Sequence, residues 1–382
     1  MNKLKHKRKG IVYLSIASVT ALLNIAARCS TAFSDGFITF ILPVIVNTYG
    51  RLMNLIPIPL GEILIGAGVV MVILAILAGP LLPAAILAKR GQMKKRIIGY
   101  YKFFAWILLF VCFIMTTNSL IMYHGSTFSE MYFTEQDVEY TMEDLIAARN
   151  FVVEQCNQLY QEMERDEAGN IIYTKDMEQE AINSMQMLGE TYERLSGYYP
   201  RAKALLFSDF CSQQYIQGYF FPFTMEANYN DVMYIMNMPA TMCHELAHMH
   251  GYILEDEANL IGFLACVESD DIFFQYSGYL SVLYYLDNDF YHSVGSNYEV
   301  YRAEPAINDQ VHEDNIFLAQ EEWDRIDSKA LFETEVVDAV SDNIMNAALK
   351  ANGVTDGMVS YSRVVGLVLQ YYAQNGYPET IR

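Results

Sequence analysis

The larger part of this sequence has very little positive charge. Residues 103–382 contain 12 Lys and Arg but 43 Asp and Glu, within a chain of 382 residues. A surface this acidic repels a phosphate backbone and has too few Lys and Arg to bind it, so nucleic acid is excluded as a partner. The same part is rich in Phe, Tyr, Leu, Ile and Met. It can therefore bury a core, and intrinsic disorder is excluded as well.

Cysteine is also scarce, and its spacing shows no pairing pattern. Six cysteines are present, and Cys112 lies within an apolar run. The chain is therefore not a disulfide scaffold. A single bridge stays open among the four cysteines of the acidic part, which are Cys156, Cys211, Cys243 and Cys266.

The N-terminal part has the opposite balance, because residues 1–102 hold 13 Lys and Arg but only Asp35 and Glu62. It also contains three long apolar runs, and a transmembrane helix needs roughly 20 such residues. We therefore expect an α-helical membrane anchor over residues 1–123. Its three transmembrane helices are predicted at residues 11–27, 60–88 and 103–123.

The basic residues of the anchor predict its orientation. They precede the first apolar run and fill the loop between the second and third runs, and clusters of this kind stay in the cytoplasm. The segment 33–59 contains Asp35, Arg51 and three prolines. If it crossed the bilayer, the two basic clusters would lie on opposite sides, so we expect a re-entrant or outer-surface segment.

This orientation makes the chain a multi-pass protein of the cytoplasmic membrane, with the lipid bilayer as a partner. Residues 124–382 then form an extracytoplasmic domain. An alternative interpretation makes residues 1–28 a cleaved signal peptide, although Arg28 is a poor residue for a cleavage site. The acidic domain lies outside the cytoplasm in both interpretations.

One short motif in the acidic domain points to chemistry. His244 and His248 are four residues apart, so on a helix both imidazoles project from one face and can share a metal ion. Pro239 suits the first turn and Gly251 the residue after the end, so we expect a helix from Pro239 to about His250. Glu245 is placed to act as a general base.

A metal bound by two histidines needs a third protein ligand. Gly251 permits a tight turn, so a second helix starting near Leu254 can fold back and present Glu255 to the metal. Glu257 is the rival ligand, and it points about 200° around the helix from Glu255. Asn259 would share the side of Glu255 and hydrogen-bond a ligating histidine. Two histidines, one carboxylate and an open position indicate a catalytic Zn²⁺ site.

The pattern of His244, Glu245 and His248 followed by Glu255, Ala258 and Asn259 resembles the gluzincin metallopeptidases. That resemblance implies a zincin-like domain that is mainly α, or α+β, with a small sheet and an edge strand. The connection between the two motifs is much shorter here than in gluzincins.

A closer resemblance covers most of the chain. It is to a family of uncharacterised bacterial membrane proteins known only as a domain of unknown function, which also have N-terminal membrane spans. The segments that carry this resemblance are residues 199–203, 221–228, 244–259, 352–353 and 360–363. It implies no established activity.

Two further parts of a peptidase site are less clearly marked. In zincins an edge strand before the catalytic helix pairs with extended substrate, and Gly218 to Phe223 is placed to do so or simply to cap the core. This segment comprises Gly218, Tyr219, Phe220, Phe221, Pro222 and Phe223. A donor to a developing oxyanion could come from several side chains, each of which could equally be structural. The candidates are Tyr291, His292, Tyr298, Tyr361 and Arg363.

The sequence therefore predicts a membrane-anchored zinc metallopeptidase that hydrolyses peptide or protein substrates outside the cytoplasm. Two alternatives remain. The first is a non-proteolytic zinc-binding sensor or scaffold of the cell envelope. The second is a zinc hydrolase that acts on cell-wall or lipid amides.

Overall fold

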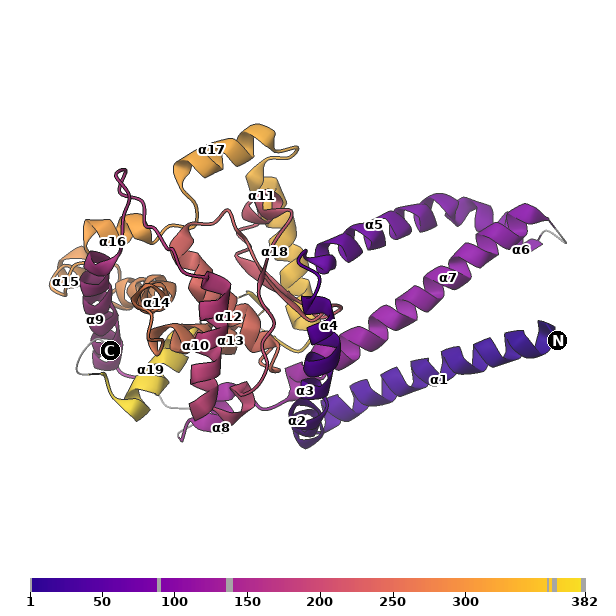
Figure 1. Ribbon diagram of the computed structural model, residues 1–382, viewed down its shortest axis with the longest axis horizontal. Coiled ribbons are helices and arrows are strands. Elements are labelled where there is room, and N and C mark those ends of the chain that lie inside the picture. The colour runs from indigo at the N-terminus through magenta and orange to yellow at the C-terminus, as the bar shows by residue number, and fades with distance from the viewer. Residues whose placement is uncertain (1, 88–90, 135–139, 356, 359–362, 379–382) are drawn as a thin grey trace.

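A computed structural model of the chain describes residues 2–87, 91–134, 140–355, 357–358 and 363–378 (Figure 1). It is mostly helical, with one small sheet and a group of apolar helices near the N-terminus. This outcome confirms the predicted combination of an apolar helical N-terminal part and a mainly α domain that contains a small sheet. All six cysteines lie within the described residues and are free thiols.

Three long helical rods project side by side from the globular part of the molecule (Figure 1). They are α1 (Asn2–Cys29), α5 (Leu60–Ala78) with its continuation η2 (Gly79–Leu81) and α6 (Leu82–Leu87), and α7 (Gln92–Met115). Most of their large apolar side chains are exposed. Among the described residues, four helical stretches are long and apolar enough to cross a membrane: Arg8–Cys29, Thr31–Asn54, Leu60–Leu87 and Gln92–His124.

The second of these stretches differs from the other three in its surroundings. It consists of α2 (Thr31–Phe40), α3 (Leu42–Ile45), η1 (Val46–Gly50) and α4 (Arg51–Asn54). These short helices run crosswise to the rods, at the end where the rods meet the globular part (Figure 1). Ile38, Leu42 and Val46 are buried against Met249 and Ile253 of the globular part. This part of the segment 33–59 is therefore held against the globular part.

The globular part surrounds one continuous hydrophobic core. Its central element is α13 (Glu255–Val267), in which every residue from Leu260 to Cys266 is buried. The helices that pack directly against it are α10 (Met177–Thr191), α12 (Met238–His248), α14 (Ile272–Ser293) and α19 (Val364–Asn375), and α9 (Met142–Leu159) packs against α14 and α19. In the described part of the chain, five shorter helices and one long helix lie farther out. The short ones are α8 (Phe128–Tyr132), α11 (Ser208–Ser212), α15 (Tyr298–Tyr301), α16 (Asp309–Asp314) and α17 (Gln320–Lys329), and the long one is α18 (Thr334–Ala351).

The sheet has three short strands in the order β1-β3-β2. They are β1 (Lys203–Ala204), β2 (Gly218–Phe221) and β3 (Glu226–Tyr229), with β2 antiparallel and β1 parallel to β3. Among the described residues β2 pairs with β3 only, so it is an edge strand. It ends before Pro222 and Phe223, whose carbonyl groups accept hydrogen bonds from Asn118 (2.9 Å) and Tyr49 (2.6 Å) of the N-terminal helices.

A buried carboxylate joins the N-terminal helices to this sheet. The Glu226 side chain accepts hydrogen bonds from the backbone N–H groups of Leu60 (3.2 Å) and Gly61 (2.9 Å), at the N-terminus of α5. A helix N-terminus favours negative charge through its free N–H groups and its dipole. Lys203 from β1 completes the arrangement with a 2.5 Å ion pair to Glu226, and both side chains are buried.

The connection is reciprocal, because α5 also sends a carboxylate into the globular part. Glu62, in the first turn of α5, accepts hydrogen bonds from the backbone N–H groups of Leu206 and Phe207. A third contact joins Asp35 of α2 to Arg194 at 2.8 Å. The N-terminal helices and the globular part are therefore held together by buried and half-buried polar contacts as well as by apolar packing.

We predict that Lys203→Ala destabilises the protein strongly, because it leaves the buried Glu226 carboxylate without its cation. Breaking a buried ion pair in this way costs about 3–5 kcal/mol. Arg201→Ala is the matched control, since Arg201 also pairs with a carboxylate at 2.5 Å, that of Asp176, but the two side chains are 45% and 51% exposed. Exposed pairs contribute about 0–1 kcal/mol. Denaturant unfolding in detergent micelles measures both, and equal losses would contradict this account of the junction.

Candidate metal centre

The helix that carries the two histidines has clear local signals at both ends. α12 runs from Met238 to His248, close to the expected range, with Pro239 in its first turn. After it the chain turns at Gly251, which has φ +91°. A side chain at this position would be strained, and its Cβ would lie 2.7 Å from Ile38 of α2. Glycine is therefore required for the turn that leads into α13.

The two imidazoles lie on one side of α12, as the spacing predicts. Their ring centroids are 4.8 Å apart. The Oε2 atom of Glu255 lies 3.1 Å from Nε2 of His244 and 3.8 Å from Nε2 of His248. Two ligands of one tetrahedral zinc ion, each about 2.0–2.1 Å from it, are roughly 3.3 Å apart. The observed distances bracket this value.

Glu255 reaches the histidines because α13 approaches α12 very closely. Gly262 marks the contact, since a Cβ atom there would lie 2.9 Å from the Ala240 carbonyl oxygen and 3.1 Å from the His244 backbone nitrogen. Any larger residue would force the helices apart. Such a shift would move the first turn of α13, and Glu255 with it, away from the imidazoles.

The surroundings of His248 favour metal binding through one defined nitrogen. Its Nδ1 atom lies 2.7 Å from the carbonyl oxygen of Tyr252, so Nδ1–H donates and Nε2 presents its lone pair to the site. Burial lowers the pKa of His248 to about 4, so the ring is neutral at physiological pH. Sequence spacing gives no sign of this partner, because the acceptor is a main-chain carbonyl in the turn.

The pKa of His244 is shifted in the opposite direction to that of His248. Burial disfavours its protonation, but the hydrogen bond with Glu255 and the charges of Glu245 and Glu255 outweigh this effect and raise the pKa of His244. A hydrogen bond with Asn259 acts in the same direction. Asn259 therefore occupies the supporting position that the sequence predicts for it, one helical turn beyond Glu255.

The environment of Glu245 is consistent with a cation bound beside it. Its side chain is buried, and its Oε2 atom has no hydrogen-bond partner among the described residues. Burial raises the pKa of Glu245 to about 8. One ligand atom each from His244, Glu245 and His248 lie within 4.8 Å of one another. A positive ion between the imidazoles would favour the ionised carboxylate and offset the cost of burying it.

Glu257, the rival ligand, faces away from the histidines. Its carboxylate accepts hydrogen bonds from the backbone N–H (3.1 Å) and the hydroxyl (2.6 Å) of Ser129, at the start of α8. Burial raises the pKa of Glu257 to about 7. The structure thus brings Glu255, and not Glu257, to the two histidines. This follows from the helical rotation between them.

Most of the suggested oxyanion donors do not approach the site. Tyr291 and Tyr298 contact Tyr301, whose hydroxyl donates to Asp287 of α14. His292 contacts Tyr291. This aromatic cluster lies at the far end of α14 and at α15, away from α12 (Figure 1). Tyr361 lies outside the described residues.

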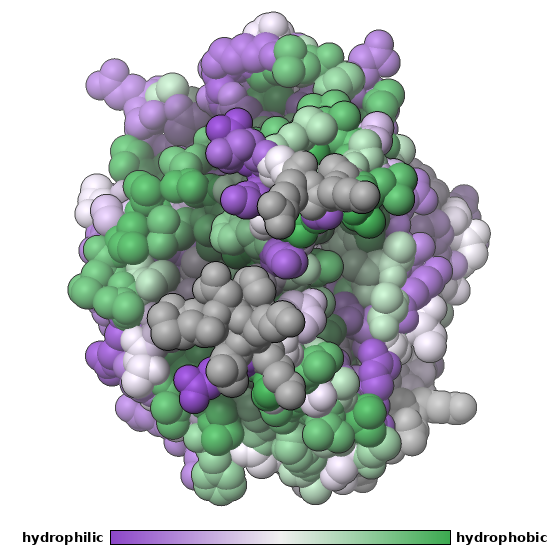
Figure 2. Space-filling model, turned by 90° about the vertical axis from the view of Figure 1, so that its right-hand side faces the viewer, coloured by the Kyte–Doolittle hydropathy of each residue, from purple (hydrophilic) through white to green (hydrophobic). Residues whose placement is uncertain are grey.

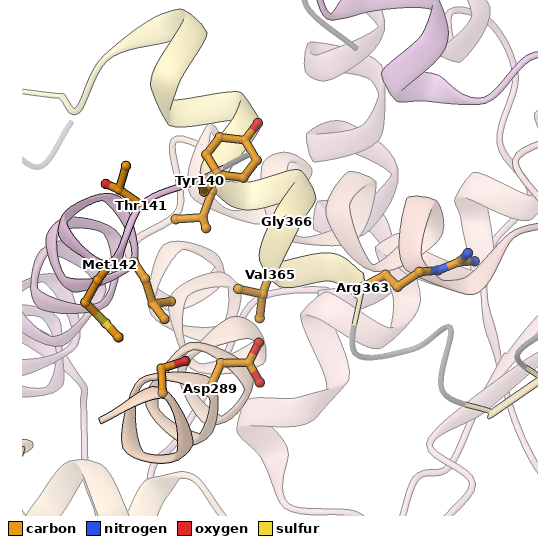
Figure 3. A pocket seen from close by; sticks show the side chains of 10 residues that line it. Tyr140, Thr141, Met142, Asp289, Arg363, Val365 and Gly366 are labelled. Atoms are coloured by element: carbon orange, nitrogen blue, oxygen red, sulfur yellow. The ribbon is translucent and has the colours of Figure 1, made fainter. Parts of the chain in front are cut away.

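Arg363 is closer to the metal-site helices. Its guanidinium forms a 3.0 Å ion pair with Asp256, the residue after Glu255. Figure 3 shows Arg363 extending away from a pocket of about 600 Å³ between α9, α14 and α19. Asp289 and Tyr140 line this pocket, which is separate from the histidines. The described contact assigns Arg363 to holding the start of α13 rather than to an oxyanion.

The edge strand β2 runs beside α12. Gly218 lies against Glu245, since a Cβ atom there would be 2.9 Å from Oε1 of that residue. The ring of Phe220 is 6.0 Å from the ring of His248. The part of the predicted segment that forms a strand, Gly218 to Phe221, therefore flanks the three residues of the motif.

One known protein family matches most of the chain. The family described as "Protein of unknown function (DUF3810)" matches residues 37–369. The chain belongs to this family. No curated protein and no solved structure matches it. The DUF3810 match begins in α2 and ends in α19, so it takes in the crosswise helices, the sheet and both helices of the candidate metal centre. The expected membership in a domain family of unknown function is confirmed, whereas the resemblance to gluzincins stays a prediction.

We predict that the purified protein contains about one zinc ion per chain and that His244→Ala abolishes this content. His250→Ala is the matched control on the same segment. His250 is stacked on Tyr199 and bonded to the Arg194 carbonyl oxygen, so its loss should leave zinc in place. Elemental analysis of both variants decides the matter, and full zinc in His244→Ala would rule out the site.

The carboxylate ligand can be tested in the same way. Glu255→Ala should lose zinc because it removes the group that lies between the two imidazoles. Glu257→Gln should retain zinc, since that side chain bonds to Ser129 instead. The reverse result would show that α13 is rotated relative to the arrangement described above.

Proposed function

We propose that this DUF3810 protein is a membrane-anchored zinc metallopeptidase that hydrolyses peptide bonds outside the cytoplasm. One observation carries the proposal. The nitrogen atoms of His244 and His248 and an oxygen atom of Glu255 converge beside Glu245, a buried carboxylate with one oxygen that has no hydrogen-bond partner in the described part of the chain. Two histidines and one carboxylate leave room for a further ligand, which is typical of a catalytic zinc site rather than a structural one.

A zinc ion held by these three residues would supply Lewis acidity, which lowers the pKa of water and polarises a carbonyl group. His248 is kept in the ligating tautomer by the Tyr252 carbonyl, and His244 is oriented by Asn259. The two helices hold both rings in fixed positions before any substrate arrives. This preorganisation is what a hydrolytic site requires.

Glu245 is the residue that moves a proton. A general base must lie within reach of the proton that it accepts, and Glu245 lies beside the two imidazoles that would hold the ion. Glu245 would accept a proton from the attacking water molecule and return it to the leaving amine. A site that only binds zinc has no use for a buried carboxylate here, so Glu245 favours an enzyme over a zinc-binding sensor or scaffold.

The edge strand supports a peptide as the substrate. Within the ranges that the structure describes, β2 has a neighbouring strand on one side only, and it passes both Glu245 and His248. An extended peptide added to this edge would place its backbone beside the metal centre. Cell-wall or lipid amides are the alternative substrates, because they meet the same chemistry outside the cytoplasm.

The arrangement of the rods supports the proposed topology. The N-terminus of α1, the end of α6 and the start of α7 lie at the same end of the rods, away from the globular part (Figure 1). The basic sequence clusters belong to these two regions. We propose that this end faces the cytoplasm, that α1, α5 and α7 cross the membrane, and that α2 to α4 stay at the outer side with the acidic domain.

Glu245→Gln should leave the zinc content unchanged and reduce hydrolysis of a fluorogenic peptide library by roughly 10²- to 10⁴-fold. The amide keeps the size of the side chain but cannot accept the proton. Glu257→Gln is the control, because it changes a buried carboxyl group that faces Ser129. Activity of Glu245→Gln equal to that of the wild type would refute the mechanism.

A further inference from the structure

Helix α18 turns its apolar side away from the protein. Of its 18 residues only Leu349 is buried. Val336, Val340 and Ile344, which are spaced four apart on one side, are 54%, 55% and 67% exposed. Asp338, on the opposite side, is half-buried. A surface helix of a soluble domain normally shows the reverse orientation.

Such a helix needs another surface to cover it. In water, isolated helices of this length are marginal even with good helix-forming residues, and most helical stability comes from packing an apolar face. α18 contains three valines and an isoleucine, which are poor helix formers. Packing against the globular part buries Leu349 and only partly covers Val337 and Met345. The exposed apolar stripe is therefore the remaining source of stabilisation.

One end of α18 is tied to the start of rod α5. Gln213, just after α11, donates hydrogen bonds to the carbonyl oxygen of Phe332 (3.1 Å) and to the hydroxyl of Thr334 (3.2 Å). The residues before α11 are held by Glu62, in the first turn of α5. The N-terminus of α18 is thus connected, through α11, to the point where α5 leaves the globular part.

The other end of α18 lies near the third rod. Asn352, the residue after α18, interacts with the phenol of Tyr123. Tyr123 belongs to η4 (Met122–His124), where the apolar stretch Gln92–His124 ends. α18 therefore extends from the outer end of one rod to the outer end of another. Figure 1 shows it running crosswise to α5 and α7, as a helix lying in the plane of a membrane would.

Further exposed apolar side chains lie next to α18. Leu331 and Phe332, just before its first turn, are 92% and 68% exposed. Leu206, Phe207 and Phe210, at the α11 end, are 54%, 60% and 51% exposed. Figure 2 shows that hydrophobic side chains gather over much of the face from which the rods project. Exposed apolar surface that extends over several elements is rare on a soluble domain.

We propose that α18, together with Leu331, Phe332 and the exposed residues around α11, lies in the outer interface of the lipid bilayer that the rods cross. The apolar stripe is immersed at the boundary between headgroups and acyl chains. Glu335 and Asp342 on the helix are acidic, so contact depends on apolar area and not on attraction to anionic lipid. This inference rests on the membrane topology and is independent of zinc and of hydrolysis.

Lipid contact can be measured by fluorescence quenching in the full-length protein. The two native tryptophans, Trp106 and Trp323, are first changed to Phe. Phe332→Trp and Ile344→Trp are then introduced singly, and each protein is placed in phosphatidylcholine nanodiscs whose lipids are brominated near the top of the acyl chains. Both tryptophans should emit at short wavelength and lose most of their emission to the brominated lipid.

Tyr284→Trp is the control, because Tyr284 is 65% exposed on α14, away from the rods. It should emit as a water-exposed tryptophan without quenching by lipid. Unquenched emission at positions 332 and 344 would overturn the proposal, whether the tryptophans are in water or shielded by a second copy of the chain. Adding anionic lipid should not strengthen the quenching, and a strong dependence on anionic lipid would also contradict the proposed mode of contact.

Discussion

The close packing of α12 against α13 is the contact on which the candidate metal centre depends. Two histidines on one helix define only part of a coordination sphere, and the carboxylate must come from elsewhere. Gly262 lets the second helix approach to within contact of the first, and Gly251 turns the chain tightly enough for it to do so. Together they place Glu255 between the two imidazoles without a long connecting loop.

The N-terminal helices are part of this assembly rather than a separate tether. Ile38 of α2 packs directly under the turn at Gly251, and the buried Glu226 joins α5 to the strand beside the edge strand β2. Asn118 from η3 (Thr116–Leu120), the short helix that follows α7, donates a hydrogen bond to the turn after β2. The site is thus supported both by α2, which we propose to stay at the outer side, and by helices that we propose to cross the membrane. A hydrolase built this way would work at a fixed, short distance from the bilayer surface.

Local patterns in the sequence predict the centre of the site well. The four-residue spacing of the histidines, the ends of α12 and the orientation of Glu255 relative to Glu257 all follow from helical geometry, and the structure agrees with each. The supporting position of Asn259 follows from the same geometry. These features are predictable because all of them lie within 25 residues along two consecutive helices.

Contacts between distant parts of the chain are not predictable in this way. Nothing in the sequence pairs Glu226 with the N-terminus of α5, and the outward apolar face of α18 looks, in sequence, like that of an ordinary amphipathic helix. The edge strand is shorter than expected because Pro222 and Phe223 serve the junction with the N-terminal helices. Residue type alone marks the oxyanion candidates in the sequence, whereas in the folded chain Tyr291 and Tyr298 pack against Tyr301.

The most direct test of the central claim is zinc X-ray absorption spectroscopy on the full-length protein. The account predicts a four-coordinate ion with only nitrogen and oxygen neighbours at about 2.0–2.2 Å, two of them showing the scattering pattern of imidazole. A sulfur neighbour at about 2.3 Å would contradict it, because a cysteine ligand such as Cys243 would then replace one of the three proposed residues. A spectrum without imidazole scattering would do the same.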